Sequence, residues 1–227
     1  ERAAVVRRIG TIFAERADEL AAIAATEMGK PLAEGIEEVT FCRAIFDYFA
    51  EEGPALAADR QLKTFSGGTA VVQRLPVGPL LGVMPWNFPY YQIARFAAPN
   101  LVLGNTVVLK ASEKCPAVHS LIAECFQSAG FPEGVVNAVS NAPEDAAKIV
   151  ETLIAHPAVR RVNFTGSTRV GRVIAETAGR YLKPALLELG GKAPFIVLDD
   201  ADIDAAVAAA AFGAYMNQGQ ICMSTER

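Results

Sequence analysis

RVNFTGSTRVG, residues 161–171, is the stretch that decides the fold. Arg161–Thr165 is a short apolar run typical of a buried strand, and Gly166 and Ser167 form a turn before a helix expected near residues 168–181. A strand that passes through a glycine turn into a helix is typical of a parallel α/β sheet. The free N–H groups and the positive dipole at such a helix start favour a phosphate group.

The same alternation extends on both sides of this stretch. We expect further strands at Leu80–Met84, Thr106–Lys110, Val135–Val139 and Ala185–Leu189, with helices near residues 90–103, 116–129 and 144–155. Short apolar strands alternating with helices indicate a doubly wound, Rossmann-like parallel sheet of the α/β class. Ligands of such sheets bind beyond the carboxyl ends of the strands, which here precede Trp86, Asn87, Lys110, Glu113, Gly166 and Ser167.

The N-terminal region is expected to be helical. A first helix contains apolar residues at helical spacing, a second runs from a cap at Asp18 through Met28 to a stop at Gly29, and a third spans about Leu32 to Ala50. These helices are expected to cover the sheet. Four acidic residues are interpreted as a solvated helix face without a function: Glu27, Glu34, Glu37 and Glu38.

A hairpin is expected at residues 63–76. The turn signal FSGGT, residues 65–69, precedes an extended stretch of β-branched residues at 70–75. Because a two-stranded hairpin is only marginally stable alone, it should pack on a partner surface. A homo-oligomer is therefore a hypothesis.

The C-terminal region predicts the start of a second α/β unit. Pro194–Leu198 is expected to be a strand, and an Asp-rich cap at residues 199–204 precedes a helix through Ala211. The segment then ends at a glycine-containing turn that carries Cys222.

Composition excludes several classes of protein. The chain has 227 residues, 52% hydrophobic, with a net charge of −4, which does not suit a surface that neutralises nucleic-acid phosphates. No apolar run is long enough for a bilayer and no signal sequence is visible, so we expect a cytoplasmic protein with neither nucleic acid nor membrane as partner. The cysteines at 42, 115, 125 and 222 form no metal or disulfide pattern, and the first three are expected to be buried and inert.

Three polar residues stand out as candidates for chemistry: Cys222, Glu188 and Asn87. A thiol is a nucleophile as the thiolate, and Glu188, in an otherwise apolar strand, should have a raised pKa that suits a base. Asn87 lies between two prolines, where a rigid amide could donate to a developing alkoxide, although an ordinary turn former is the alternative. A cysteine–histidine hydrolase is weakly supported, because neither histidine is near the Cys222 segment.

The 166–171 turn leaves two readings open when taken alone. It lacks the GxGxxG fingerprint, and Arg172 and Val173 stand where a nucleotide triphosphatase would have Lys and Ser or Thr. A tight turn without a ligand remains the alternative to a phosphate site. Lys110 and Glu113 likewise could be a surface ion pair or could bind a ribose at the ligand edge of the sheet.

Five segments in order resemble the aldehyde dehydrogenase superfamily. They are Pro85-Trp86-Asn87-Phe88-Pro89, Lys110-Ala111-Ser112-Glu113, Phe164-Thr165-Gly166-Ser167-Thr168, Leu187-Glu188-Leu189-Gly190-Gly191-Lys192 and Gly219-Gln220-Ile221-Cys222. Ser224 departs from the family pattern, in which a smaller residue or Asn is usual. The resemblance implies the N-terminal cofactor-binding portion of a longer enzyme, with residues 1–62 and 77–188 as the dinucleotide-binding domain, 63–76 as an oligomerisation hairpin and 189–227 as the start of the catalytic domain.

The resemblance also implies roles for individual residues. Cys222 would be the nucleophile, Glu188 the base that activates water for thioester hydrolysis, and Asn87 with the Cys222 backbone N–H the oxyanion site. No metal is implied. The residues implied to bind NAD, with NADP possible, are Met84, Pro85, Trp86, Lys110, Ser112, Glu113, Phe164, Thr165, Gly166, Ser167, Val170 and Leu189. Glu113 would repel a 2′-phosphate and so favour NAD.

The substrate is implied less clearly, because the two halves of the chain differ. Residues 75–110 resemble succinate-semialdehyde dehydrogenases, and residues 113–227 resemble the salicylaldehyde and aromatic aldehyde branch. A full-length homodimer or homotetramer acting on a small aldehyde is expected. A cofactor-binding module without turnover and a noncatalytic structural protein are the alternatives, and intact Cys222, Glu188 and Asn87 argue against the latter.

Overall fold

A parallel five-stranded sheet is the centre of the computed structural model, which describes residues 1–65 and 67–227. Its strands are β3 (Leu80–Val83), β4 (Val107–Lys110), β5 (Val136–Val139), β6 (Arg161–Thr165) and β7 (Ala185–Glu188). They lie in the order β5-β4-β3-β6-β7, and every neighbouring pair is parallel. The doubly wound α/β fold predicted from the sequence is therefore confirmed, and each of these five strands lies within one residue of its predicted bounds.

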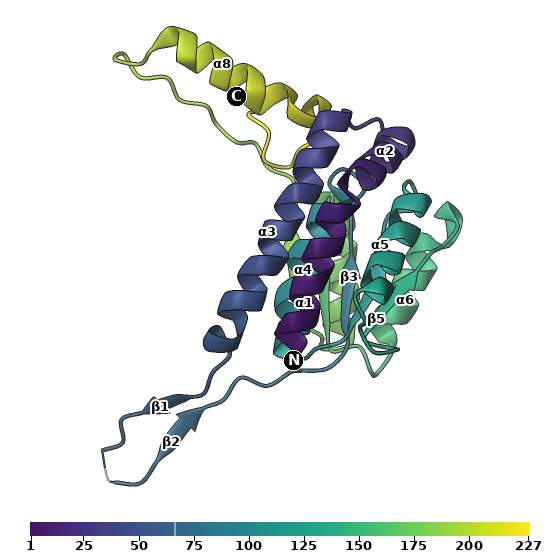
Figure 1. Cartoon of the computed structure of the whole chain (residues 1–227), viewed down its shortest axis with the longest axis vertical. Coiled ribbons are helices and arrows are strands. Elements are labelled where there is room, and N and C mark those ends of the chain that lie inside the picture. Colours follow the sequence, from purple (N-terminus) through teal and green to yellow (C-terminus); the bar gives the residue numbers. More distant parts are fainter. Residues whose placement is uncertain (66) are drawn as a thin grey trace.

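Helices cover both faces of this sheet (Figure 1). One face packs against α4 (Pro89–Leu103) and α5 (Pro116–Ser128), and the other against α6 (Ala146–Ala155), which follows the short 3-10 helix η1 (Pro143–Asp145), and α7 (Thr168–Arg180). Alternation along β3 divides the apolar side chains between two cores, since Leu80 belongs to the first and Leu81 and Val83 to the second. Each fully buried aliphatic side chain contributes about 1.5–3 kcal/mol.

The sheet order creates a switch point between β3 and β6. From β3 the chain proceeds outward through β4 to β5, and it then returns to place β6 on the opposite side of β3. The crevice at the carboxyl ends of these two strands is where ligands of doubly wound sheets bind. Residues 84–87 follow β3 at this crevice, and residues 166–167 follow β6.

Three N-terminal helices form a further layer: α1 (Arg2–Glu15), α2 (Ala17–Met28) and α3 (Leu32–Leu56). They pack on α4 and α5, and their apolar side chains join the core on that face of the sheet, so they cover the sheet as an outer layer. Asp18 is not the cap of α2, because the helix begins at Ala17; the residue lies in the first turn, where the helix dipole still favours a carboxylate. Gly29 does end α2, with the left-handed φ of 74° that glycine tolerates.

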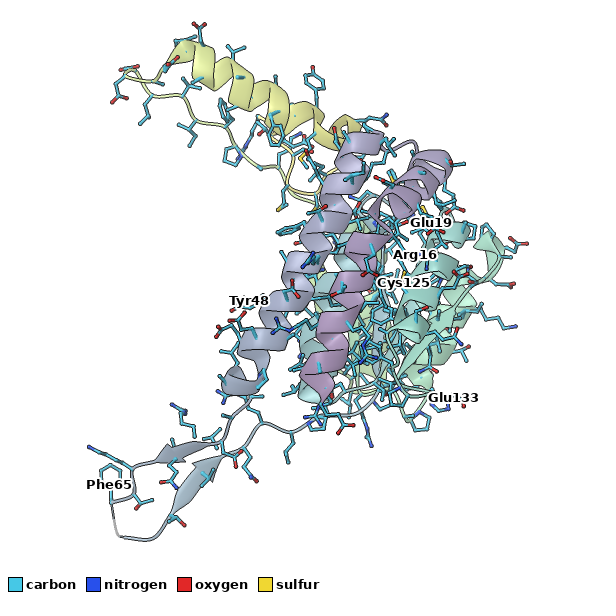
Figure 2. The ribbon with its side chains drawn as sticks, in the orientation of Figure 1. Arg16, Glu19, Tyr48, Phe65, Cys125 and Glu133 are labelled. Carbon is cyan, nitrogen blue, oxygen red and sulfur yellow. The ribbon has the colours of Figure 1, made fainter. Side chains whose placement is uncertain are left out.

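The hairpin consists of β1 (Arg60–Leu62) and β2 (Ala70–Val72), an antiparallel pair that projects away from the body (Figure 1). Its first strand begins before residue 63, and Ser66 of the predicted turn lies outside the described residues. Phe65, at the end of the projection, is exposed (Figure 2). Among the described residues, β1 and β2 pair with no further strand, although a two-stranded element is only marginally stable alone.

The C-terminal arm consists of residues 189–202, α8 (Ile203–Tyr215) and the 3-10 segment η2 (Met216–Gly219). Asp202 caps α8 as expected, since its Oδ1 accepts from Ala205 N at 3.1 Å. The predicted strand at 194–198 is wrong. Phe195 N donates to Arg227 O at 2.6 Å beside an isolated bridge of Ala193 with Thr225, but the described residues form no strand here, and Ile196 and Leu198 are 76% and 67% exposed. A strand requires a neighbouring strand to complete its hydrogen bonds.

Within residues 1–65 and 67–227, no helix combines the length and the apolar composition that a bilayer crossing requires.

Candidate active site

A cleft of about 420 Å³ opens at the carboxyl ends of β3 and β6. It brings together the three residues predicted to perform chemistry, Asn87, Glu188 and Cys222, although Cys222 follows Asn87 by more than a hundred positions. The rest of its lining is Pro85, Trp86, Gln92, Thr165, Gly166, Ser167, Leu189, Gly190, Gly219, Gln220 and Ile221. The predicted nucleophile, base and oxyanion donor thus share one cavity.

Cys222 lies on a sharp turn at the end of η2. Asn217, Gln218 and Gly219 have φ values of 48°, 58° and 74°, so the chain passes through three successive left-handed residues. A left-handed residue other than glycine costs roughly 1–2 kcal/mol, less for Asn, and surrounding contacts must therefore hold the turn. Ser224 is one of them, because its buried Oγ lies 2.9 Å from Ile221 O and 3.3 Å from Gly219 O.

The four thiols differ in exposure as the sequence predicted. Cys222 is exposed, whereas Cys42, Cys115 and Cys125 are buried. Burial raises the pKa of the Cys115 thiol to about 11 and raises the pKa of Cys42 and Cys125 as well. Arg16, paired with Glu19, approaches Cys125 at 3.5 Å (Figure 2), which opposes this effect only in part. Cys222 is the thiol that reagents and substrates can reach.

Asn87 is held against the backbone just before Cys222. Its Nδ2 donates to Gln220 O at 2.8 Å, which leaves the second N–H of the amide for another acceptor. The Cys222 backbone N–H donates to no acceptor within the described residues. One N–H of the Asn87 amide and the Cys222 backbone N–H therefore have no acceptor among the described residues.

Glu188 lines the cleft, but its expected burial is wrong for this chain. Its side chain is exposed, while its carbonyl accepts from Gly166 N at 3.0 Å. The reason is topological: β7 is the edge strand of the sheet, so no neighbouring strand covers its outer side. Apolar neighbours along the sequence did not reveal which strand would lie at the edge.

The residues predicted to bind a cofactor follow the carboxyl edge of the sheet. Pro85, Trp86, Thr165, Gly166, Ser167 and Leu189 line the cleft. Ser167 caps α7 by accepting from Val170 N at 3.3 Å, and the other N–H groups of that first turn face the same end of the sheet. A helix N-terminus beside a glycine turn and an aromatic side chain suits a dinucleotide phosphate.

Lys110 and Glu113 form an ion pair of 2.8 Å at the end of β4. Partial burial raises the pKa of Glu113, but the hydrogen bond from Lys110 and nearby positive charge outweigh it and the net pKa is lowered. The carboxylate is therefore ionised and could accept from ribose hydroxyls. Lys110, Ser112, Glu113 and Val170 lie outside the cleft lining, farther along the edge.

Met84 and Phe164 belong to the hydrophobic cores, so their side chains support the site from below. Phe164 packs beneath the turn at Gly166, where an added Cβ would lie 2.6 Å from Phe164 Cζ. Glycine at 166 thus permits the close packing of Phe164 under it.

The acidic residues of α2 and α3 do not form the solvated face that the sequence predicted. Glu27 accepts from Ala117 N and Val118 N, each at 2.8 Å, at the start of α5. Glu34 accepts from Asn217 N, and Glu38 is buried beside Lys30. Of the four, only Glu37 is exposed without such a contact among the described residues. The prediction failed because α3 is enclosed by α1, α2 and α4 and by the C-terminal arm.

Sequence reasoning also missed polar residues next to the cleft. Gln92 lines it, and Arg95 Nη2 donates both to Gln92 Oε1 at 2.8 Å and to Thr165 Oγ1 at 2.9 Å. Polar residues at positions 92 and 95 of a largely apolar helix were the available signal. Asn217 lies in the same segment as Cys222, and its residue type alone gives no signal of its buried contacts.

The profile described as "Aldehyde dehydrogenase family" matches residues 1–227. The chain belongs to the aldehyde dehydrogenase family. It is 66% identical over 161 residues to a vanillin dehydrogenase of Pseudomonas fluorescens, covering 71% of this chain and 33% of that protein. It is 47% identical over 227 residues to a succinate-semialdehyde dehydrogenase [NADP(+)] of Deinococcus radiodurans, covering 100% of this chain and 46% of that protein.

Among solved structures, a salicylaldehyde dehydrogenase from Pseudomonas putida G7 complexed with salicylaldehyde superimposes with a TM-score of 0.97. It is 42% identical, and the match covers 100% of this chain and 47% of that chain. The chain thus spans less than half the length of these family relatives.

Proposed function

We propose that the protein carrying this chain oxidises an aldehyde to a carboxylic acid with NAD or NADP as hydride acceptor. The observation that supports this proposal is the shared cleft of Cys222, Asn87 and Glu188 beside the α7 N-terminus. Membership of the aldehyde dehydrogenase family supports it independently.

The proposed chemistry begins at Cys222. Its thiolate forms a C–S bond to the carbonyl carbon, and the displaced π electrons become an oxyanion that accepts from Asn87 Nδ2 and the Cys222 N–H. A bound nicotinamide cofactor would accept the hydride that the tetrahedral carbon loses. The product on the protein is a thioester at Cys222.

Glu188 acts in the second half of this scheme. Its carboxylate takes a proton from water, the hydroxide adds to the thioester carbon, and the C–S bond breaks to release the carboxylic acid and the Cys222 thiolate. Because Glu188 is exposed at the edge of the sheet, water can reach it without a conformational change.

For the cofactor, we propose NAD in preference to NADP. The argument depends on Glu113, whose ionised carboxylate would accept from ribose hydroxyls and repel a 2′-phosphate. The relative from Deinococcus radiodurans is named for NADP(+), so the two cofactors must be compared directly.

The substrate proposal keeps two classes: an aromatic aldehyde such as vanillin or salicylaldehyde, and succinate semialdehyde. Relatives named for each class match the chain. We also propose that the projecting hairpin, β1 and β2, joins subunits of a homodimer or homotetramer, since its strands have no partner within the described chain.

The test is steady-state oxidation of the three aldehydes by the full-length protein, with each cofactor in turn. Cys222→Ala should abolish oxidation of every aldehyde while cofactor binding, followed by fluorescence titration, stays within about 2-fold, because the thiol forms the covalent intermediate and does not hold the cofactor. Unchanged turnover in that variant would falsify the assignment of the nucleophile.

A second candidate is a cofactor-binding module without turnover. It is favoured by the exposure of both Cys222 and Glu188 in this chain, since a site open to water lacks the low dielectric that strengthens catalytic electrostatics. Cofactor binding without oxidation of any of the three aldehydes would favour this candidate.

A further inference from the structure

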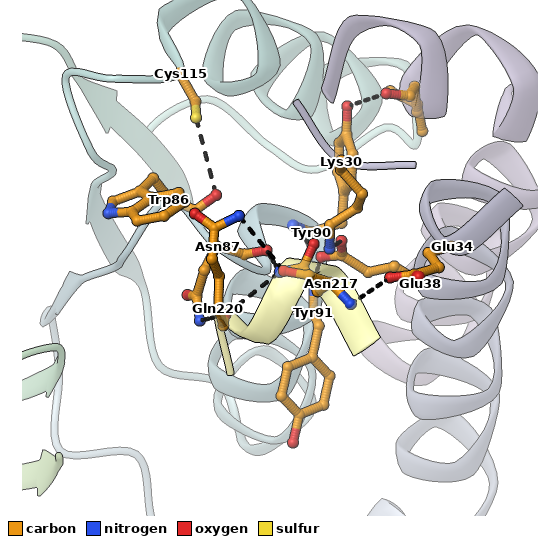
Figure 3. Close-up of polar contacts among 11 residues, drawn as sticks. Lys30, Glu34, Glu38, Trp86, Asn87, Tyr90, Tyr91, Cys115, Asn217 and Gln220 are labelled. Atoms are coloured by element: carbon orange, nitrogen blue, oxygen red, sulfur yellow. Dashed lines mark hydrogen bonds and ion pairs between the residues drawn. The ribbon is translucent and has the colours of Figure 1, made fainter. Parts of the chain in front are cut away.

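Helix α3 contacts residue 217, at the start of the segment that carries Cys222, and residues 90 and 91, just after the turn that carries Asn87. We name residues 85–88 the donor turn, since they carry Asn87, and residues 217–222 the nucleophile segment. Glu34 and Glu38 lie four positions apart on α3, hence on one face of the helix. Figure 3 shows these two carboxylates directed toward the region between the donor turn and the nucleophile segment.

Glu38 binds the backbone that directly follows the donor turn. Its Oε1 accepts from Tyr90 N and Tyr91 N, each at 2.9 Å, in the first turn of α4 directly after the donor turn. Its Oε2 lies 2.5 Å from Lys30 Nζ, and that ammonium lies 3.6 Å from the centroid of the Phe88 ring. Glu38 and Lys30 are almost completely buried, so the donor turn is anchored in the protein interior.

Glu34 holds the nucleophile segment at its first residue. Its Oε2 accepts from Asn217 N at 2.6 Å, a charge-assisted hydrogen bond. Asn217 is completely buried, and its Nδ2 lies 3.1 Å from Asn87 O and 3.3 Å from Gln220 O. The amide of Asn217 therefore joins the nucleophile segment to the donor turn, and Glu34 fixes the backbone from which that amide extends.

The backbone of the nucleophile segment needs such support. Left-handed conformations at Asn217 and Gln218 persist only where the surroundings determine them. Two contacts from the α2–α3 region supply this: Glu34 at Asn217 N, and Gly29 O, which accepts from Gln218 Nε2 at 3.1 Å. Gln220 O then lies where it accepts from Asn87 Nδ2.

We propose that Glu34 is a positioning residue for the reaction: through Asn217 it sets the position of Cys222 relative to the amide of Asn87. The inference rests on the proposed function, because the distance between thiol and oxyanion donor matters only if a carbonyl is attacked there. Glu34 touches no reacting atom, and its effect passes through the backbone of residues 217–222.

Three variants of the full-length protein test the proposal. Glu34→Ala removes the acceptor of Asn217 N. Glu34→Gln keeps an amide oxygen at the same reach and should restore the hydrogen bond. Glu37→Ala is the matched control, because Glu37 is on the same helix, is exposed and makes no side-chain hydrogen bond within the described residues.

Two readouts are needed. The first is amide hydrogen exchange of peptides covering residues 217–222, measured by mass spectrometry, which reports the ordering of the nucleophile segment without turnover. The second is kcat for aldehyde oxidation with the KM for the cofactor. Removing one oxyanion donor costs about 100-fold to 1,000-fold in kcat, so a misplaced one in Glu34→Ala should cost on the order of 10-fold or more, with an unchanged cofactor KM.

The proposal predicts faster exchange and a lower kcat in Glu34→Ala, wild-type values in Glu37→Ala, and recovery of both in Glu34→Gln. Unchanged exchange in Glu34→Ala overturns it, as does faster exchange with a wild-type kcat. If Glu34→Ala does not fold, the same two measurements are compared between Glu34→Gln and Glu34→Leu. The leucine keeps the bulk of the side chain but has no acceptor, so only Glu34→Leu should show faster exchange and a lower kcat. A wild-type protein that oxidises no aldehyde refutes the proposed function instead, and the exchange data still show whether Glu34 orders the segment.

Discussion

Alkylation of the native chain should single out one of its four thiols. Iodoacetamide reacts with the thiolate, and it must reach the sulfur. Burial raises the pKa of Cys115 from 9.0 to about 11, and each unit is a tenfold change, so near neutral pH this thiol has roughly 100-fold less thiolate than an ordinary thiol. Cys42 and Cys125 have raised pKa values and no exposed surface, whereas Cys222 is exposed. We expect Cys222 to react at least about 100-fold faster than Cys115.

The assay is a time course with limiting reagent, followed by peptide mass spectrometry that counts the label at each cysteine. Unfolding the protein in urea is the first control, since all four thiols should then react at similar rates. Cys222→Ser is the second, and it should leave the native protein almost unlabelled. Labelling of Cys115 or Cys125 within about 10-fold of the rate at Cys222 would refute the reasoning, because it would mean that burial does not control access here.

Three further outcomes follow from the site. Glu188→Gln should lower steady-state turnover by roughly 100-fold or more while a rapid-mixing burst of reduced cofactor stays near one per active site; loss of the burst would assign Glu188 to an earlier step. Glu113→Ser should raise the NADP to NAD ratio of kcat/KM by about 10-fold or more, equivalent to about 1.4 kcal/mol, and an unmoved ratio would show that Glu113 does not face the ribose. Burial, with nearby Lys110, lowers the pKa of His119 below 6.5, so the unfolded chain binds the proton more readily and stability should fall as pH drops below about 6.5. In urea unfolding at several pH values, His119→Gln should reduce this dependence of the midpoint on pH. The same dependence in both proteins would refute the assignment to His119.

Local sequence patterns predicted the sheet well because the residues that begin and end each strand lie within a few positions of it. Arg161–Thr165 was predicted with its observed bounds, and the glycine turn and helix start after it followed from the residue types alone. The order of the strands was a different matter. It decided that β7 lies at the edge and that Glu188 is exposed, which its apolar neighbours along the chain did not indicate.

Side-chain partners distant in sequence account for the other errors. Residues 194–198 have the composition of a strand, yet a strand also needs a neighbour whose presence is a property of the whole fold. Glu34 and Glu38 have the spacing of a solvated helix face, and only the folded chain shows that Asn217 and Tyr90 lie opposite them.

By itself, the sequence determined the α/β class and the strands and helices of the sheet, and it marked Cys222, Glu188 and Asn87 as candidates for chemistry, because periodicity, turn residues and side-chain reactivity are local properties. The tertiary structure alone decided that these residues share one cleft, that Asn87 donates to Gln220 O, and that Glu34 of α3 accepts from Asn217 N. These facts depend on which surfaces meet when the sheet and its helices pack. Burial and hydrogen-bond partners are set by that packing, and residues more than a hundred positions apart carry no local signal of it.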